Sequence, residues 1–204
     1  MNTPASYFEG QYARAADPWQ LAQRWYDQRK YALTVAALPR TRYRRAFEPG
    51  CSVGVLSELL APRCDALLCA DRVPSAVGTA TRRLVGLPQV TVQHMVVPDE
   101  WPDGALDLVV LSELLYYFDS AARARVLRQS ASSLGDGGHL ITVHWNHPVD
   151  EHTLTGREVA EEVNTLPELR PLARYDDPDF TLTVHERGTM SGTALSPARA
   201  EGLA

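Results

Sequence analysis

The chain has few cysteines and almost no lysine, and both shortages argue against particular classes of protein. Its three cysteines are an odd number and include no CxxC pair, which argues against a disulfide framework and against a thiolate zinc site. Lys30 is the single lysine, so the lysine that a phosphate-binding P-loop needs after its glycines is missing. Schiff-base chemistry would depend on Lys30 alone, and we expect neither class of enzyme here.

Long apolar runs and an excess of positive charge are missing as well. No stretch approaches the roughly 18 uninterrupted apolar residues of a membrane span. The first residues, MNTPASYFEGQY, lack the basic and apolar regions of a secretory signal. A net charge of −5 would repel nucleic acid and anionic membranes. We expect one globular domain of a cytoplasmic protein, a monomer or homodimer without a nucleic-acid or membrane partner.

Short apolar runs alternate with helical patterns along most of the chain, as in βαβ units. The alternation predicts an α/β fold with a mostly parallel sheet and helices on both faces. Strands are predicted at residues 45–48, 66–70, 90–94, 106–111 and 138–144. Helices are predicted at residues 17–38, 52–61, 75–85 (capped by Ser75), 120–134 and 154–166 (capped by Thr155 with Glu158). Residues 169–175 and 180–186 are predicted to form a hairpin, and residues 1–10 a frayed terminus.

The most informative segment is a glycine turn between a predicted strand and a predicted helix, with the sequence FEPGCSVG at residues 47–54. Such a turn lets the backbone approach a ligand, with helix N–H groups directed toward it. The dinucleotide fingerprint G-x-G-x-x-G/A fails, because Val55 stands where a small residue is required. The segment matches E-x-G-x-S-x-G instead, with Glu48, Gly50, Ser52 and Gly54 at alternate positions.

An acidic residue follows this turn at an informative distance. Asp71 ends the next apolar run, 21 residues after Gly50. At the end of a second strand, a carboxylate can accept hydrogen bonds from both hydroxyls of a ribose. The turn and Asp71 together predict a ligand that carries a nucleoside, bound at the carboxyl ends of the first two strands.

These residues resemble a known family. Residues 48–54 with Asp71 look like the motif that binds S-adenosyl-L-methionine (AdoMet) in class I, Rossmann-like methyltransferases. The resemblance continues in LDLVVLSELLYY at 106–117 and LGDGGHL at 134–140. More narrowly, DPW at 17–19, LAPRC at 60–64 and SELLYY at 112–117 resemble the nodulation protein S type of N-methyltransferase. The general resemblance covers roughly residues 12–187.

The resemblance implies a seven-stranded sheet whose terminal hairpin holds the one antiparallel strand, and AdoMet as the cofactor. Residues 40–187 would form the methyltransferase domain and 1–39 a helical lid over the cofactor. Residues 188–204, which are rich in Gly, Ser, Thr, Ala and Pro without a period, are expected to form a disordered tail. The cofactor-binding residues that it implies are Glu48, Gly50, Cys51, Ser52, Ser112 and Glu113 for the methionine part, Asp71 for the ribose, and Arg72, Met95 and Val96 for the adenine. From the lid, Trp19 would add aromatic surface, and Arg29 would either pair with the cofactor carboxylate or remain solvated.

Candidate catalytic residues follow the fourth and fifth predicted strands. Either His144 or His147 would remove a proton from the acceptor, or both would merely complete hydrogen bonds with the loop backbone. Glu113 is a further candidate base, and Tyr117 is placed to face the methyl donor. With His152, the two histidines do not form a recognised zinc pattern, and no metal is expected.

The sequence therefore predicts an AdoMet-dependent methyltransferase that acts on an amine or hydroxyl of a small molecule. The narrower resemblance favours an amino sugar or a glycosylated metabolite as acceptor. Two alternatives remain: an RNA-modifying enzyme that uses the arginines of residues 40–45, and a non-catalytic AdoMet-binding protein.

Overall fold

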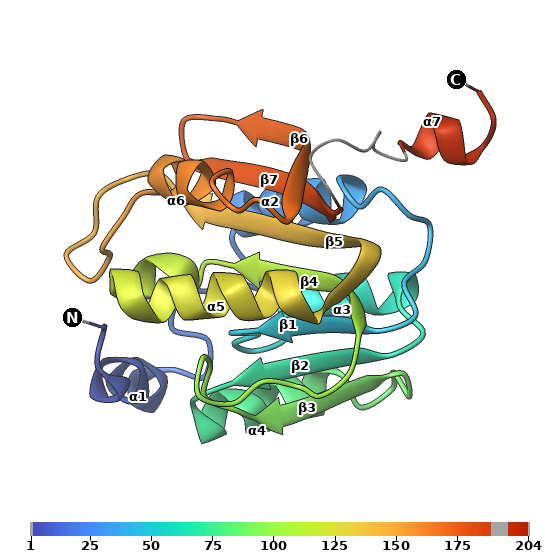
Figure 1. The fold of residues 1–204 in the computed structure, drawn as a ribbon. Coiled ribbons are helices and arrows are strands. Elements are labelled where there is room, and N and C mark those ends of the chain that lie inside the picture. The colour runs from blue at the N-terminus through green and yellow to red at the C-terminus, as the bar shows by residue number, and fades with distance from the viewer. Residues whose placement is uncertain (1, 189–195, 204) are drawn as a thin grey trace.

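The computed structural model describes residues 2–188 and 196–203. One seven-stranded sheet with the order β3-β2-β1-β4-β5-β7-β6 forms its centre (Figure 1). The first five strands run parallel, and β7 lies antiparallel to both β5 and β6. The strands are β1 (Ala46–Pro49), β2 (Leu67–Asp71), β3 (Val90–His94), β4 (Leu106–Ser112), β5 (Leu134–Trp145), β6 (Leu169–Asp176) and β7 (Phe180–Arg187). The predicted α/β fold with its single antiparallel strand is confirmed.

Helices cover both faces of the sheet, so the strands read as continuous apolar runs. In Figure 1, α5 and α6 lie in front of the sheet. One apolar core joins their side chains to that face, and a second core joins the opposite face to α2, α3 and α4. The helices are α1 (Ala5–Arg14), α2 (Trp25–Ala36), α3 (Val55–Leu60), α4 (Pro74–Arg83), α5 (Ser120–Ser133), α6 (Gly156–Val163) and α7 (Pro197–Ala200), with short 3-10 turns η1 (Ala61–Arg63) and η2 (Leu115–Tyr117).

The N-terminal region differs from its prediction. Residues 5–14 form α1, where a frayed end was expected, and α2 begins at Trp25 instead of Asp17. The Asp17 carboxylate accepts hydrogen bonds from the backbone N–H groups of Leu21 and Ala22, at 3.0 and 3.1 Å. Gln20 has a φ of 57°. Asp17 thus closes a turn, because an aspartate can cap a turn as well as a helix.

Two helix starts are also corrected, and a third is confirmed. α3 begins only after Gly54, whose φ of 80° interrupts the helical path. α4 starts at Pro74 without the predicted side-chain cap from Ser75. The capping box of Thr155 with Glu158 at the start of α6 is present as predicted. Of the tail, residues 189–195 and 204 lie outside the described residues.

None of the helices in the described ranges has the length and apolar character needed to cross a bilayer.

Candidate functional site

A cavity of about 370 Å³ lies where the carboxyl ends of β1, β2 and β4 meet. The glycine turn after β1 and the residues that end β2 and β4 line one side of the cavity. The N-terminal segment, from Thr3 to Tyr31, contributes the other wall, and Trp145 to His152 close a third side. The cavity is thus assembled from several separate parts of the chain at the strand edge where ligands of open α/β sheets bind.

Gly50 brings the backbone into this cavity. Its φ is +76°, and its N–H donates to the Ala70 carbonyl of β2 at 2.7 Å. A Cβ atom at this position would stand 3.1 Å from Cδ1 of Leu114. Glycine is therefore required here for both its left-handed backbone and its lack of a side chain.

Asp71 joins the end of β2 to the glycine turn. Its carboxylate accepts hydrogen bonds from the N–H groups of Ser52, at 3.0 Å, and Val73, at 2.9 Å. Burial raises the pKa of Asp71, although these backbone donors act in the opposite direction. A carboxylate has about four lone-pair positions. Two bonds fix its orientation and leave acceptor capacity toward the cavity.

Glu48 is the neighbouring carboxyl group and is only 2% exposed. The Ser57 hydroxyl donates to its Oε2 at 2.6 Å, and the Cys69 thiol lies 3.7 Å from the same oxygen. Burial raises the pKa of Glu48 to about 8. The cavity therefore contains a carboxyl group that keeps its proton near neutral pH.

The raised pKa of Glu48 predicts a pH dependence of stability. In the unfolded chain Glu48 ionises near its ordinary pKa of about 4.3, whereas in the folded chain it holds its proton up to about pH 8. Between these values the unfolded state binds fewer protons, so the free energy of unfolding falls as pH rises. In Glu48→Gln that fall is expected to disappear, so the variant gains stability relative to the parent from pH 5 to pH 8. Urea unfolding across this range measures it, with the surface variant Glu58→Gln as control; parallel curves for parent and Glu48→Gln would contradict it.

Glu113, at the end of β4, is held by several donors. Nζ of Lys30 lies 2.8 Å from its Oε1 and 3.0 Å from Oδ1 of Asp27, and the Tyr116 hydroxyl donates to its Oε2. Burial acts to raise the pKa of Glu113, but the Lys30 ammonium and the Tyr116 hydroxyl outweigh it and lower the pKa. Glu113 is therefore a stable anion and a weak base, and its predicted role as a base stays a prediction. Neither the sequence motifs nor the resemblance identified Lys30 as part of the site.

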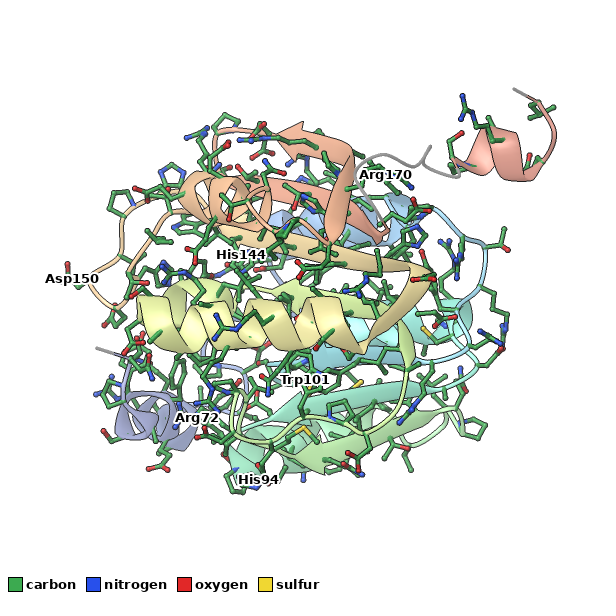
Figure 2. All side chains as sticks on the ribbon, viewed as in Figure 1. Arg72, His94, Trp101, His144, Asp150 and Arg170 are labelled. Carbon is green, nitrogen blue, oxygen red and sulfur yellow. The ribbon has the colours of Figure 1, made fainter. Side chains whose placement is uncertain are left out.

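The two histidines predicted as candidate bases do not line the cavity. His144, on β5 in Figure 2, is 1% exposed, and its Nε2 accepts from the N–H groups of Leu114 and Leu115 at 3.3 and 3.0 Å. Burial lowers its pKa to about 3. His147 is exposed, with its Nε2 2.8 Å from Oδ1 of Asp179. Both imidazoles complete local hydrogen bonds, as the alternative interpretation of the sequence had it.

Two further positions differ from expectation. Arg29 lies outside the cavity, where its guanidinium donates to Asp177 at 2.5 Å and to the Tyr175 hydroxyl at 2.6 Å. Arg24, just before α2, lines the cavity in its place. Val97 lines the cavity and the predicted Val96 does not; the backbone N–H of Val96 donates to the Glu100 carboxylate. The other predicted residues that line the cavity are Trp19, Glu48, Gly50, Cys51, Ser52, Asp71, Arg72, Met95, Ser112, Glu113 and Tyr117.

The N-terminal segment contacts the turn and the strand ends directly. The hydroxyls of Tyr12 and Ser52 are 2.5 Å apart, and the Thr3 N–H donates to the Tyr117 carbonyl at 2.9 Å. The Phe8 ring meets the Tyr117 ring edge to face at 4.9 Å. Figure 2 shows Arg72 beside α1, and its guanidinium carbon is 5.8 Å from the Phe8 centroid.

Metal-ligating side chains do not gather in the part of the chain that the structure describes: no group of three or more His, Cys, Asp or Glu is placed to hold an ion. Its three cysteines are buried and free.

Comparison with known proteins agrees with this architecture. A family model described as Nodulation protein S (NodS) matches residues 9–143. Nodulation protein S of Rhizobium tropici is 30% identical over 129 residues, which are 62% of this chain and 54% of the relative. The chain thus spans about half the length of that curated relative.

Solved structures share the fold. A Pseudomonas syringae protein, provisionally described as a methyltransferase, is 40% identical with a TM-score of 0.72, and the match covers 80% of this chain and all of that one. The N-methyltransferase NodS from Bradyrhizobium japonicum WM9, in complex with S-adenosyl-L-homocysteine, has a TM-score of 0.81 at 22% identity, over 92% of this chain and 99% of that one. From the family match over residues 9–143, the chain belongs to the nodulation protein S family.

Proposed function

We propose that the protein is an AdoMet-dependent methyltransferase that transfers a methyl group to an amine of a small molecule. The observation that carries the proposal is the meeting of Gly50 and Asp71 in one cavity at the carboxyl ends of β1 and β2. The family membership and the printed descriptions of its relatives support the same activity.

The residues present fit a nucleoside joined to an amino acid. Asp71 has free acceptor capacity for two ribose hydroxyls, and Gly50 leaves the space that a Cβ would fill. Arg24 would pair with the carboxylate in place of Arg29. Met95 and Val97 offer apolar surface to the adenine.

The cofactor, when bound, supplies a methyl group on a positively charged sulfur that needs little further activation. The task of the chain is to align an acceptor with that methyl group and to exclude water. Alignment of this kind contributes about 7–11 kcal/mol. Aromatic walls from Tyr26, Tyr117 and Trp145 suit the dispersed positive charge of the reaction.

The charges around Lys30 favour an amine over a hydroxyl acceptor. Asp27 and Glu113 face the one ammonium of Lys30, so this group of three carries one unit of negative charge. This part of the cavity attracts a cationic acceptor. We retain an amino sugar or a glycosylated metabolite as the proposed acceptor class, following the family resemblance.

We further propose that residues 1–39 act as a lid over the cofactor and that the protein works in the cytoplasm as a monomer or homodimer. The contacts of Tyr12 with Ser52 and of Thr3 with Tyr117 support the lid. The three free, buried cysteines fit a reducing compartment. Size-exclusion chromatography with light scattering distinguishes monomer from homodimer.

The first test of the cofactor is calorimetric titration with S-adenosyl-L-homocysteine, with NADH as the control ligand. Asp71→Asn is expected to weaken the affinity about tenfold, because one charged hydrogen bond to the ribose is worth about 1.5 kcal/mol or more. Asp99→Asn, an exposed carboxylate outside the cavity, is the matched control. Unchanged affinity of Asp71→Asn would refute the ribose assignment, and absence of binding by the parent chain would refute the proposed function.

The RNA-modifying alternative is not favoured. The basic cluster of residues 40–45 precedes β1 and therefore lies at the amino ends of the strands, away from the cavity. Arg42 pairs with Asp65, and Arg40 and Arg44 are each 3.9 Å from Asp107. Methylation of any small amine by the protein would exclude the other alternative, a non-catalytic AdoMet-binding protein.

A further inference from the structure

His152 is the histidine that lines the cavity. All six histidines of the chain fall within the described residues, and the other five have their imidazoles elsewhere. His152 lies on the loop between β5 and α6, on the same side as Glu113 and Tyr117. Its backbone N–H donates to the Val149 carbonyl at 3.0 Å.

Contacts with η2 hold the imidazole in place. The His152 ring stacks on the Tyr116 ring, with centroids 3.7 Å apart and planes inclined by 17°. The Tyr117 ring meets it edge to face at 4.9 Å. The next residue, Thr153, donates from its backbone N–H to the Tyr116 carbonyl at 2.7 Å and from its hydroxyl to the Phe118 carbonyl at 2.8 Å. The loop is therefore fastened to the residues that follow β4.

The imidazole keeps a nitrogen unused by the fold. Nδ1 of His152 is buried and has no hydrogen-bond partner in the described part of the chain. This differs from His144, whose Nε2 accepts two backbone N–H groups, and from His147, which faces Asp179. Burial lowers the pKa of His152, so the ring is neutral near pH 7 and able to accept a proton. A buried polar atom without a partner otherwise costs free energy.

From this geometry we propose that His152 is the catalytic base, which takes a proton from the ammonium form of the acceptor before methyl transfer. This inference rests on the proposed function. The proton moves from the acceptor nitrogen to the imidazole and leaves a neutral amine with a free lone pair. That lone pair forms the new N–C bond while the C–S bond breaks, and the electron pair of the C–S bond remains on sulfur. The imidazolium then releases its proton to solvent.

Glu113 complements this role. It already accepts from Lys30, Tyr116 and the backbone N–H of Trp145, so it attracts the charged acceptor without taking the proton. The titratable groups that face or act on His152 are Glu113, Tyr116 and Tyr117 near β4, His144 on β5 and Glu151 in its own loop.

The test compares His152→Gln with Asp150→Asn, a substitution in the same loop at an exposed residue that Figure 2 shows at its outer end. Initial rates of methyl transfer from AdoMet to benzylamine and to D-glucosamine are measured from pH 6.5 to 9.5. At pH 7, His152→Gln is expected to lower kcat/KM for benzylamine about 100-fold, with unchanged affinity for S-adenosyl-L-homocysteine. Asp150→Asn is expected to match the parent.

Two features separate proton transfer from a structural role. The loss of kcat/KM in His152→Gln is expected to shrink as pH rises. At higher pH the acceptor is already deprotonated in solution, so no base is needed to remove its proton. The loss is also expected to be smaller for D-glucosamine, whose electron-withdrawing oxygens make its ammonium more acidic. A loss that is equal at all pH values, or an unchanged rate, would overturn the role of His152. Failure of the parent chain to bind S-adenosyl-L-homocysteine, or to methylate either amine, would overturn the proposed function and this inference with it.

Discussion

Replacement of Lys30 by methionine is expected to destabilise the fold by about 3–5 kcal/mol, the usual loss when one partner of a buried ion pair is removed. The Lys30 side chain is 2% exposed, and its ammonium faces both Asp27 and Glu113. Methionine fills a similar volume but leaves these two carboxylates without a cation. For a chain of this length the loss corresponds to a fall in Tm of about 10 °C, which scanning calorimetry measures.

The double variant Lys30→Met/Glu113→Gln is the control for this prediction. Removal of one carboxylate together with the ammonium leaves a single acid to be neutralised, so part of the lost stability should return. A loss below about 1 kcal/mol in Lys30→Met, as for an exposed pair, would show that water reaches the carboxylates. The predicted ion network would then be wrong.

Gly50→Val is expected to weaken the affinity for S-adenosyl-L-homocysteine about 100-fold or more, which is about 2.7 kcal/mol. A β-branched residue is strained at a φ of +76°. Its Cβ would stand 3.1 Å from Cδ1 of Leu114, and its methyl groups would crowd the surface where the backbone approaches the ligand. Calorimetric titration of the folded variant measures the loss.

The matched control is Gly86→Ala, because a Cβ at Gly86 meets nothing within 4 Å and the residue does not have a left-handed φ. Its affinity should equal that of the parent chain. If Gly50→Val also binds normally, the glycine turn does not contact the ligand. Circular dichroism of both variants distinguishes lost binding from lost folding.

The sheet was predictable because parallel strands carry a strong signal. β3 has the same bounds in the sequence prediction and in the structure, and β4 differs by one residue. β4, which is covered on both faces, reads as a nearly continuous apolar run, whereas the edge strand β3 alternates apolar and polar residues. The glycine turn and Asp71 were predictable for a related reason, because a left-handed backbone and a strand-end carboxylate each limit the residue type.

His144 and His147 do not line the cavity, although they lie near the end of a strand, because position along the chain does not determine the contacts of a side chain. His144 lies near the end of β5, and its Nε2 accepts from the N–H groups of Leu114 and Leu115. Those donors belong to a turn about thirty residues earlier, and no local pattern reports them. His152 was visible as a histidine, but its place in the cavity depends on stacking against Tyr116.

Arg29 lies outside the cavity for a different reason. A helix predicted from residues 17 to 38 includes both Arg24 and Arg29. The observed α2 starts at Trp25, so Arg24 lies in the preceding chain and lines the cavity, while Arg29 turns toward Asp177. The start of α2 therefore determines which arginine lines the cavity.

The wall formed by residues 3–24 has a kinetic consequence. This stretch of the described chain pairs with none of the seven strands, and its links to the cavity include the Tyr12–Ser52 hydroxyl contact and the Thr3–Tyr117 backbone bond. It can separate locally while the sheet stays intact. In the proposed lid, the dissociation rate of a bound molecule would then be set by how often residues 3–24 separate from the strand ends. Amide hydrogen exchange of residues 3–24 would slow on ligand binding, whereas the exchange of β4 and β5 would hardly change.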